Sequence, residues 1–467
     1  LKFAPHGIKC TNTNNNDNDH SLRVEWIWLP DNGLSGSIPW MELSLLDELQ
    51  ALILTSNPDL GGNNNNNNTN EATTTAVTTL PSSLRFSKLK LLALSGISLQ
   101  GTIPDNFFIQ FPQLEILSMA HNQLTGTIPS LIHSSTIKEL SLEHNLLTGD
   151  IQSFYSSSLE ELYLEDNILR FDIDTTFLQN CTNLRQLDFS DNPEAGGTVP
   201  VHLFRHLEVF DAHGTNITTF PDFDDGTTTN LSFLALHDNL NLRGPFPENT
   251  FRSLQKLRHL DLTSTSVMTE EMPKMIGNLT NLEYLFLANI QTLVSGTIPS
   301  EYQRLTKLQD FSLKNSNRIG TLPNFFSNMT SLYLLDLDSN QLSGTIPSSP
   351  SWLPSSIQFL MLNRNNFTGT IPSFIGKQIL QLLFLNDNSL TGTIPEELSQ
   401  LENLELLFLQ KNPVLIPNNN TLICTTTRQK NWQIDCGIVG CPCCSCCFPP
   451  TTTTLNTNNQ SFCNNDN

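Results

Sequence analysis

Acidic side chains recur at regular spacing between residues 139 and 261, and no lysine or arginine shares their positions. Grouped carboxylates bind basic partners or Ca²⁺, and a matched pair can act as acid and base in glycoside hydrolysis. No spacing singles out one such pair, so we set the hydrolase interpretation aside. A solvated surface on an acidic protein is the simpler alternative. The carboxylates are Glu139, Glu143, Glu161, Glu165, Asp166, Asp188, Asp191, Asp211, Asp238 and Asp261.

Histidines occupy equivalent positions, namely His144, His213, His237 and His259. Imidazoles in neighbouring repeats can bind a transition metal or titrate near pH 6. No compact ligand motif fixes a metal geometry, and the chain lacks a Gly-x-Ser-x-Gly elbow, a His-Glu-x-x-His pair and a phosphate loop. We therefore predict no metal, no cofactor and no catalytic residue, and do not expect an enzyme.

A second group of residues with binding chemistry is apolar and lies toward the C-terminus. It comprises Tyr284, Phe286, Leu334, Phe359, Met361, Leu382, Phe384, Leu406 and Phe408. An exposed apolar stripe usually marks an interface, and buried aromatic side chains dominate binding energy. Coverage by a cap or by the C-terminal tail is the alternative. From both groups, the predicted ligand-binding residues are Tyr163, Asp188, Asp211, Asp261, Phe286, Asp336, Phe359, Met361, Phe384 and Phe408.

The repeat that would position these side chains is seen most clearly in Leu332-x-x-Leu335-x-Leu337-x-x-Asn340-x-Leu342-x-Gly344-x-Ile346-Pro347. Leucines that alternate with polar residues predict a strand with one buried face. A buried asparagine at the end of that strand can bond backbone groups that a turn leaves unpaired. One copy cannot bury its own leucines, whereas stacked copies form a parallel sheet over a continuous core.

Successive asparagine positions lie 22 to 26 residues apart, and we count about 16 repeats. The chain is therefore predicted to be one α/β solenoid rather than several globular domains. Five repeats lack the asparagine, and four of these fall between residues 215 and 316. We expect a looser or locally bent ladder in that stretch.

Composition changes divide the chain into a partial N-terminal cap (1–21), a solenoid (22–417), a Cys-rich C-terminal cap (418–447) and a disordered tail (448–467). The Asn- and Thr-rich residues 63–79 are predicted to be a disordered insertion in the solenoid. The polar run Thr11 to Asp19 is expected to be mobile, and the cap is expected to cover Trp26 and Trp28.

The recurring run Leu-x-x-Leu-x-Leu-x-x-Asn-x-Leu-x-Gly-x-Ile-Pro, as in Leu383 to Pro395, resembles the plant-type extracellular leucine-rich repeat family. Phe3 to Cys10 looks like the end of that family's N-terminal cap, and the Cys-rich end is similar to algal members. The resemblance implies a right-handed superhelix with a concave parallel sheet, a second short sheet near the Gly-x-Ile-Pro segments, and partner binding. The kinase motifs of receptor relatives are absent from this sequence.

Charge and cysteine usage predict the compartment. A net charge of −21 with a pI near 4.7 excludes a nucleic-acid surface. Of ten cysteines, only Cys10 and Cys181 precede Cys424, which favours a disulfide-braced C-terminal cap that includes Cys424 and Cys436 over a thiolate metal site. Cys181 is expected to be a buried free thiol. Predicted N-glycosylation sites are Asn67, Asn180, Asn216, Asn230, Asn278, Asn328, Asn366, Asn419 and Asn459.

No apolar run is long enough to span a bilayer, and the sequence begins at Leu1, so we expect any signal or membrane anchor to lie outside it. We predict an extracellular or cell-surface module, receptor-like or inhibitor-like, that binds a protein, peptide or glycan through the concave face. Homo-oligomerisation is left open.

The alternative is a structural or lattice-binding protein, ice included, that uses regularly spaced threonines. β-branched residues suit a short second sheet, which is the simpler account of them. The threonines are Thr102, Thr127, Thr198, Thr297, Thr321, Thr345, Thr370 and Thr393.

Overall fold

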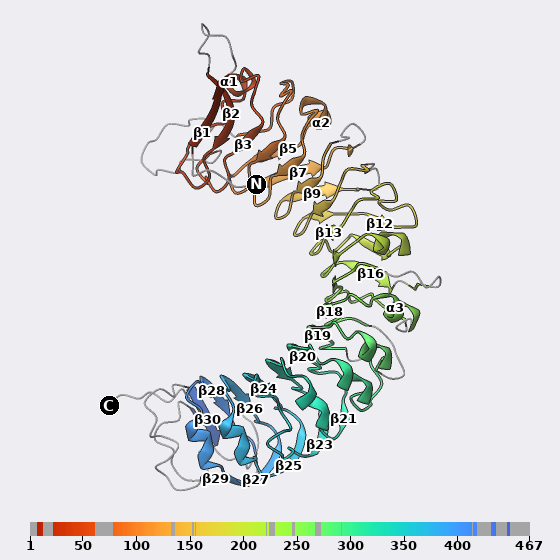
Figure 1. Ribbon diagram of the computed structural model, residues 1–467, viewed down its shortest axis with the longest axis vertical. Helices are drawn as coiled ribbons and strands as arrows, with labels where there is room; N and C mark the ends of the chain where they lie inside the picture. The colour runs from red at the N-terminus through yellow and green to blue at the C-terminus, as the bar shows by residue number, and fades with distance from the viewer. Residues whose placement is uncertain are drawn as a thin grey trace, which may run out of the picture. The chain divides into compact units, whose positions relative to one another are not determined.

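The computed structural model describes most of the chain and divides it into two compact units (Figure 1). Unit 1 comprises Leu1–Pro221 and Thr229–Asn241, and unit 2 comprises Asp222–Thr228 and Leu242–Asn467. The described residues are 7–12, 22–60, 78–131, 136–151, 154, 156–220, 222–223, 229–244, 248–266, 272–290 and 292–412, with strands at 414–417, 431–435 and 446–448.

Short parallel strands, one per repeat, form the main sheet of unit 1. The middle residue of each three-residue strand is buried and its neighbours are mostly half-buried, as the alternation of leucines predicts. The strands are β2 (Leu22–Trp28), β3 (Ala51–Ile53), β4 (Leu91–Ala93), β6 (Ile116–Ser118), β8 (Glu139–Ser141), β10 (Glu161–Tyr163), β13 (Gln186–Asp188), β15 (Val209–Asp211) and β17 (Phe233–Ala235).

Unit 2 repeats this arrangement with its own parallel strands. They are β18 (His259–Asp261), β19 (Tyr284–Phe286), β20 (Asp310–Ser312), β22 (Leu334–Asp336), β24 (Phe359–Met361), β26 (Leu382–Phe384), β28 (Leu406–Phe408), β30 (Asn431–Asp435) and β31 (Cys446–Phe448).

Short helices follow the strands, and most of the 3₁₀ helices begin directly after a proline, whose fixed φ suits the first turn. In unit 1 they are α1 (Trp40–Ser44), α2 (Phe107–Gln110) and η2 (Val201–Arg205). In unit 2 they are α3 (Glu248–Ser253), η3 (Lys274–Asn278), η4 (Ser300–Arg304), η5 (Asn324–Asn328), η6 (Ser373–Lys377) and η7 (Glu396–Gln400).

The predicted second set of strands is present near the Gly-x-Ile-Pro segments. Unit 1 has one sheet of β5 (Gln100–Thr102), β7 (Gln123–Thr127), β9 (Leu146–Gly149) and β11 (Ile168–Leu169), and another of β12 (Asp172–Ile173), β14 (Gly196–Thr198) and β16 (Asn216–Thr219). Unit 2 has β21 (Ile319–Gly320), β23 (Gln341–Thr345), β25 (Asn366–Gly369), β27 (Ser389–Ile394) and β29 (Val414–Pro417).

The repeat asparagines join neighbouring repeats as well as closing their own turn. Asn340 Oδ1 accepts hydrogen bonds from the backbone N–H groups of Ser316 and Arg318, at 3.1 and 2.9 Å. Its Nδ2 donates to the carbonyl oxygens of Leu313 and Leu337, at 2.8 and 3.1 Å. The buried amide therefore satisfies backbone groups of two repeats at once.

Repeats without the asparagine keep their place in the main sheets. The hydroxyl of Thr215 donates to the carbonyl of Ala212 at 2.7 Å, and the hydroxyl of Ser316 donates to that of Leu287 at 2.5 Å. The expected loosening is seen in the second sheet, where the described part of unit 2 ahead of β21 has only the single Gly296–Arg318 bridge.

Six of the eight regularly spaced threonines, all except Thr198 and Thr393, pack against the glycine of the next repeat. An added Cβ at Gly369, where φ is +77°, would lie 2.9 Å from Cγ2 of Thr345. The same contact joins Gly344 to Thr321 at 2.9 Å and Gly126 to Thr102 at 2.8 Å. Part of each such threonine thus serves repeat packing.

Two predicted boundaries were wrong. Thr11 and Asn12 lie in β1 (Gly7–Asn12), which pairs antiparallel with β2, because backbone pairing needs no apolar side chain. Lys9 in β1 places Nζ 5.1 Å from the ring centre of Trp26. The predicted insertion ran two residues too far, since Thr78 is buried and the carbonyl of Thr79 accepts a bond from the Trp40 indole at 3.0 Å.

At the other end, β30 continues the main sheet of unit 2 beyond β28, with Trp432 in register with the buried Leu407. Strand β30, which falls within the range predicted for the C-terminal cap, thus pairs with the edge of the last repeat, and β31 pairs with β30. Cys424, Cys436, Asn67, Asn419, Asn459 and the predicted tail beyond residue 448 lie outside the described residues.

Candidate functional site: the outward strand columns

Parallel register brings the predicted ligand-binding residues into columns. In unit 1, Tyr163, Asp188 and Asp211 are successive register partners on β10, β13 and β15. In unit 2 the equivalent column runs Asp261, Phe286, Ser312, Asp336, Met361, Phe384 and Phe408. Phe359 lies in the neighbouring column, between Leu334 and Leu382. Within each unit, the parallel register thus places the predicted residues in the same column or in neighbouring columns.

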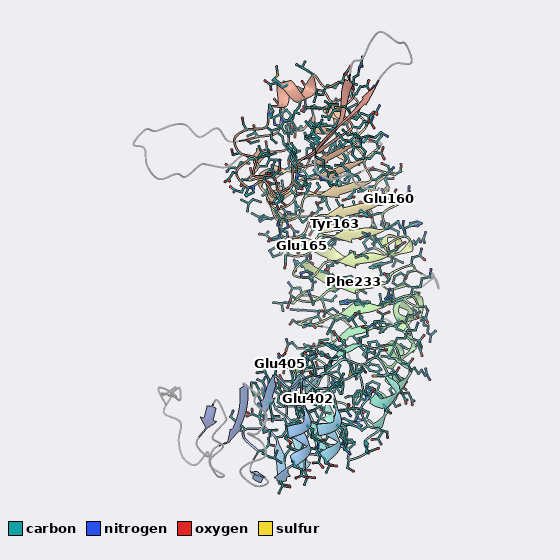
Figure 2. The ribbon with its side chains drawn as sticks, turned by 60° about the vertical axis from the view of Figure 1, so that its left-hand side comes forward. Glu160, Tyr163, Glu165, Phe233, Glu402 and Glu405 are labelled. Carbon is teal, nitrogen blue, oxygen red and sulfur yellow. The ribbon has the colours of Figure 1, made fainter. Side chains whose placement is uncertain are left out.

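Tyr163 is the centre of a polar cluster in unit 1 (Figure 2). Its hydroxyl lies 2.9 Å from Glu161 Oε2 and 2.8 Å from Gln186 Oε1. Burial and the hydrogen bond to Glu161 raise the pKa of this phenol, so it remains a donor. Burial and the charges of Glu161 and Glu143 raise the pKa of the neighbouring Glu139. The cluster is thus crowded with negative charge.

His213 is held between two carboxylates farther along the same sheet. Its Nδ1 lies 2.7 Å from Asp211 Oδ1, and its Nε2 lies 3.4 Å from Asp191 Oδ2. Burial disfavours the imidazolium, but the hydrogen bond to Asp211 and both charges outweigh burial and raise the pKa of His213 to about 9. Burial and the charge of Asp211 raise the pKa of Asp188 to about 6.

We define the acidic face as Glu139, Glu143, Glu161, Glu165, Asp188 and Asp211 of unit 1. In the described structure none of these carboxylates is ion-paired with a lysine or arginine, and histidines are their cationic neighbours. His144, for example, places Nδ1 2.8 Å from Asp166, and this bond raises its pKa. No group of metal-ligating side chains occurs among the described residues. The face therefore carries more carboxylates than cationic partners.

We define the apolar column as Met361, Phe384 and Phe408 of unit 2. All three side chains are half-buried. The rings of Phe384 and Phe408 stack with centroids 4.5 Å apart and planes 11° apart. Phe359, in the next column, packs against Tyr333 with centroids 4.8 Å apart. The result is a continuous apolar surface across three repeats.

The structure corrects the placement of Asp336, which was predicted to be an exposed ligand contact. Asp336 is only 8% exposed; its Oδ1 accepts the N–H of Asp338 at 3.0 Å, and its Oδ2 accepts the Ser312 hydroxyl at 3.4 Å. Little of its carboxylate is therefore open to a ligand. Asp338, also buried, receives two bonds of 2.8 Å from Arg364.

Sequence reasoning missed a row of amides beside the apolar column. The carbonyl oxygens of Asn363, Asn386 and Gln410 are buried without a hydrogen-bond donor in the described structure. The first two amides are fixed in orientation because their nitrogens donate to carboxylates, Asn363 to Asp338 and Asn386 to Asp387. Each of the three residues lies two positions before a repeat asparagine, and this shared spacing could have identified them in the sequence.

The predicted glycosylation sites that the structure describes, and the two described cysteines outside the strands of the C-terminal cap, lie outside the columns. Asn180, Asn230, Asn328 and Asn366 are exposed, while Asn216 and Asn278 are half-buried. Cys181 is a buried free thiol, as predicted, and Cys10 is free and exposed. No helix within the described ranges combines the length and apolar character needed to cross a membrane.

Comparison with known proteins identifies the repeat. The family model described as Leucine Rich Repeat matches residues 113–135, 331–353, 356–378 and 380–401. Human oligodendrocyte-myelin glycoprotein is 31% identical over 158 residues, covering 30% of this chain and 34% of that protein. Receptor-like protein EIX1 of Solanum lycopersicum is 39% identical over 66 residues, covering 14% of this chain and 6% of that protein. The chain thus spans about a third or less of these curated relatives.

Solved structures share the fold over most of the chain. A TDR receptor superimposes with a TM-score of 0.66 at 22% identity, covering 89% of this chain and 79% of that one. The Arabidopsis receptor kinase HAESA ectodomain, in complex with an N-terminally extended IDA peptide hormone, gives 0.62 at 24%, covering 88% and 70%. The plant peptide hormone receptor RGFR1 in complex with RGF2 gives 0.54 at 24%, covering 88% and 78%.

Proposed function

We propose that this chain, whose fold is a leucine-rich repeat solenoid, is an extracellular recognition module that binds a peptide or protein through its outward strand columns. Relatives that share the fold were solved with peptide hormones bound. Such similarity establishes the fold, whereas the binding role proposed here is supported by the chemistry of the columns.

The observation that carries the proposal is the apolar column. Stacked phenylalanines on the outward side of a sheet have no role in holding the leucine core, and exposed apolar surface of this kind usually marks an interface. A ligand with apolar anchors, such as a peptide that carries aromatic or aliphatic side chains, complements this column.

The acidic face favours a ligand with basic residues. Its carboxylates are not neutralised by lysine or arginine in the described structure, so a positively charged segment would gain electrostatic attraction there. A glycan ligand lacks that charge and is an outcome of the test below. Secretion, disulfides at Cys424 and Cys436, glycosylation, homo-oligomerisation and an anchor outside this sequence belong to the same proposal.

Selection from a library of short random peptides tests the proposal. The full chain, made in a secretory host, should enrich peptides with apolar residues, which bind the apolar column, and peptides with basic residues, which bind the acidic face. Phe384→Ala with Phe408→Ala should weaken binding of the apolar peptides at least tenfold, as expected for aromatic anchors. Phe325→Ala is the matched control because Phe325 is also half-buried but lies on η5.

The electrostatic part has its own control. Glu139→Gln with Glu161→Gln should reduce binding and its salt dependence, whereas Glu402→Gln, an exposed carboxylate of unit 2, should not (Figure 2). Enrichment of no peptide, combined with binding to a glycan array that these variants leave unchanged, would overturn the proposal.

A further inference from the structure

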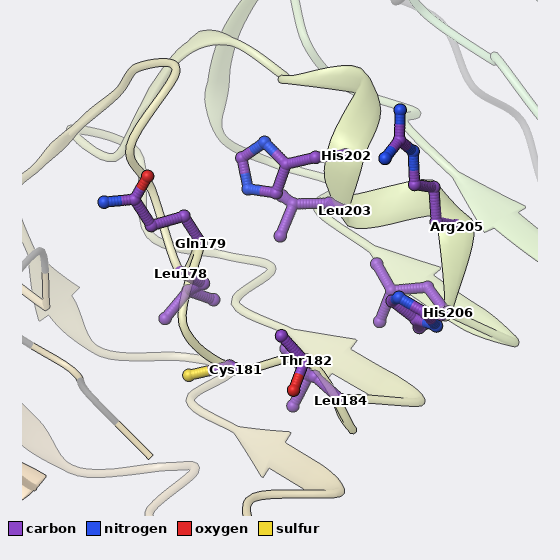
Figure 3. A pocket seen from close by; sticks show the side chains of 10 residues that line it. Leu178, Gln179, Cys181, Thr182, Leu184, His202, Leu203, Arg205 and His206 are labelled. Carbon is purple, nitrogen blue, oxygen red and sulfur yellow. The ribbon is translucent and has the colours of Figure 1, made fainter. Parts of the chain in front are cut away.

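A hollow of about 160 Å³ lies in unit 1 between the turn that precedes β13 and helix η2 (Figure 3). At two other places in the described structure, loops of neighbouring repeats pack backbone to backbone. An added Cβ at Gly277 or Gly376 would overlap the backbone of Glu301 or Glu397 in the next repeat. Protein interiors are close-packed, so a hollow between two repeats is a local packing defect that a bound group could fill.

The hollow has an apolar floor and a polar rim. Leu178, Leu184, Leu203 and Leu207 form the floor, and each is at most 6% exposed. The rim carries the exposed side chains of Gln179, Thr182 and His206 and the half-buried imidazole of His202. Figure 3 shows Gln179 and His202 on opposite sides of it. The apolar floor can contact the carbon face of a ring, and the polar rim can hydrogen-bond its edge, so the hollow suits an amphipathic ring.

Two bonds fix the chemistry that the rim and floor present. His202 Nε2 lies 3.0 Å from the carbonyl oxygen of Phe177 and donates to it, so Nδ1 is left for a second partner. Cys181 directs its thiol to the carbonyl of Phe154 at 3.8 Å, and burial raises its pKa. The thiol is therefore a neutral part of the wall rather than a reactive group.

The turn at the lip of the hollow is strained. Leu178 has φ of +51°, a left-handed conformation that is unfavourable for a residue with a bulky side chain. Most other non-glycine residues with positive φ directly precede a repeat asparagine position, as His144 and Asp166 do. Leu178 does not belong to that series. Its strain is specific to the turn that carries Asn180.

Asn180 carries a glycosylation sequon at the edge of the hollow, and its chain neighbours belong to the lining. The sequon is Asn180-Cys181-Thr182, and Gln179, Cys181 and Thr182 all line the hollow. Asn180 is exposed. A sugar on its amide nitrogen would begin beside the rim. The volume is well below the roughly 300–1,000 Å³ of pockets for drug-sized ligands, so it suits a single ring.

We propose that the hollow seats the first N-acetylglucosamine of a glycan on Asn180, which completes the packing between the two repeats. The ring carbons and acetamide methyl cover the leucine floor, and the hydroxyls and acetamide bond to Gln179, Thr182 and His202. The linkage forms when the Asn180 amide nitrogen attacks C1 of the sugar on a lipid-diphosphate donor; the amide loses a proton and the lipid diphosphate leaves. This inference rests on the secretory part of the proposed function.

The test compares secreted full-length protein, trimmed enzymatically to one N-acetylglucosamine per occupied sequon, with its Asn180→Gln variant. Mass spectrometry should find Asn180 occupied. Amides of residues 178–184 and 201–207 should exchange about tenfold faster in Asn180→Gln, because the packing of both loops is lost. Asn328→Gln, which removes an exposed sequon on η5, should leave these amides unchanged.

Leu203→Phe gives a second measurement, since a larger side chain fills the hollow while the sequon is kept. In that background Asn180→Gln should no longer accelerate exchange. An occupied Asn180 whose removal leaves exchange unchanged overturns the proposal. So does an empty Asn180 beside occupied sequons elsewhere, a result that leaves the proposed function standing. If no sequon is occupied, the secretory part of the proposed function fails as well.

Discussion

His213 and Asp211 form a side-by-side pair on the acidic face, with Nδ1 2.7 Å from Oδ1. The pKa of His213 is raised from 6.5 to about 9. A raised folded-state pKa contributes stability that is complete below the unfolded value and is lost as pH rises through the folded value. The pair should therefore stabilise unit 1 below about pH 6.5 and lose that contribution as pH rises through 9.

His213→Gln tests this dependence. The variant should be about 2 kcal/mol less stable at pH 6 and nearly equal to the wild type at pH 10, after allowance for partial exposure of the pair. Urea unfolding at both pH values measures the difference. His206→Gln, an exposed histidine, is the control. The same penalty at both pH values would show that the pair acts through packing rather than charge.

Asp188 should destabilise the folded protein at neutral pH, where its carboxylate is ionised. Its pKa is raised from 3.8 to about 6, so the contribution present below about pH 3.8 is lost as pH rises through 6. Asp188→Asn should be about 2 kcal/mol more stable than the wild type at pH 7.5 and equal to it at pH 3.5.

Asp174→Asn provides a comparison of opposite sign. The hydroxyl and N–H of Thr176 lower the pKa of Asp174, so removing its charge should not stabilise the protein at any pH. If both substitutions stabilise the protein at pH 7.5, general relief of negative charge, rather than the site, is responsible.

The sequence predicted the columns because strand period and repeat length together set the register. It could not separate Asp188 from Asp336, which hold the same position in their repeats. Both carboxylates accept a serine hydroxyl, Asp188 from Ser190 of its own repeat and Asp336 from Ser312 of the preceding repeat. Asp188 remains half-buried, whereas Asp336 is only 8% exposed. The deciding neighbours come from adjacent repeats, about one repeat away in sequence, and a pattern read within one repeat omits them.

The pairing of His213 with Asp211 was accessible in part, since residues two apart on a strand share a face. The second carboxylate, Asp191, comes from the preceding repeat and required the structure. The hollow beside Asn180 could not be predicted from the sequence, because it forms where two loops of neighbouring repeats do not pack closely against each other. Local pattern thus predicts which face a residue occupies, and packing between repeats determines its surroundings.

Asn340 should be a sensitive polar position, because its amide bonds backbone groups of two repeats. Asn340→Ala leaves buried N–H and carbonyl groups of two repeats unpaired, which should cost about 3 kcal/mol. Asn340→Thr should cost less, because Thr215 shows that a hydroxyl at this position bonds the local carbonyl. Urea unfolding with hydrogen exchange of residues 313–342 measures both. Equal losses for the two variants would rule out the hydrogen-bond explanation.

Thr345 and Gly369 provide a test of packing at the second sheet. Gly369→Ala forces a side chain into a left-handed backbone and against Cγ2 of Thr345, and should cost about 2 kcal/mol. Thr345→Ser removes only the opposing methyl group and should be nearly neutral alone. In the double variant the methyl clash is absent, so the loss should be smaller than for Gly369→Ala, with the backbone strain remaining. A double-mutant cycle from urea unfolding measures this coupling. Strict additivity would show that the threonine methyl does not set the glycine requirement, and would leave the threonine edge available for a lattice ligand.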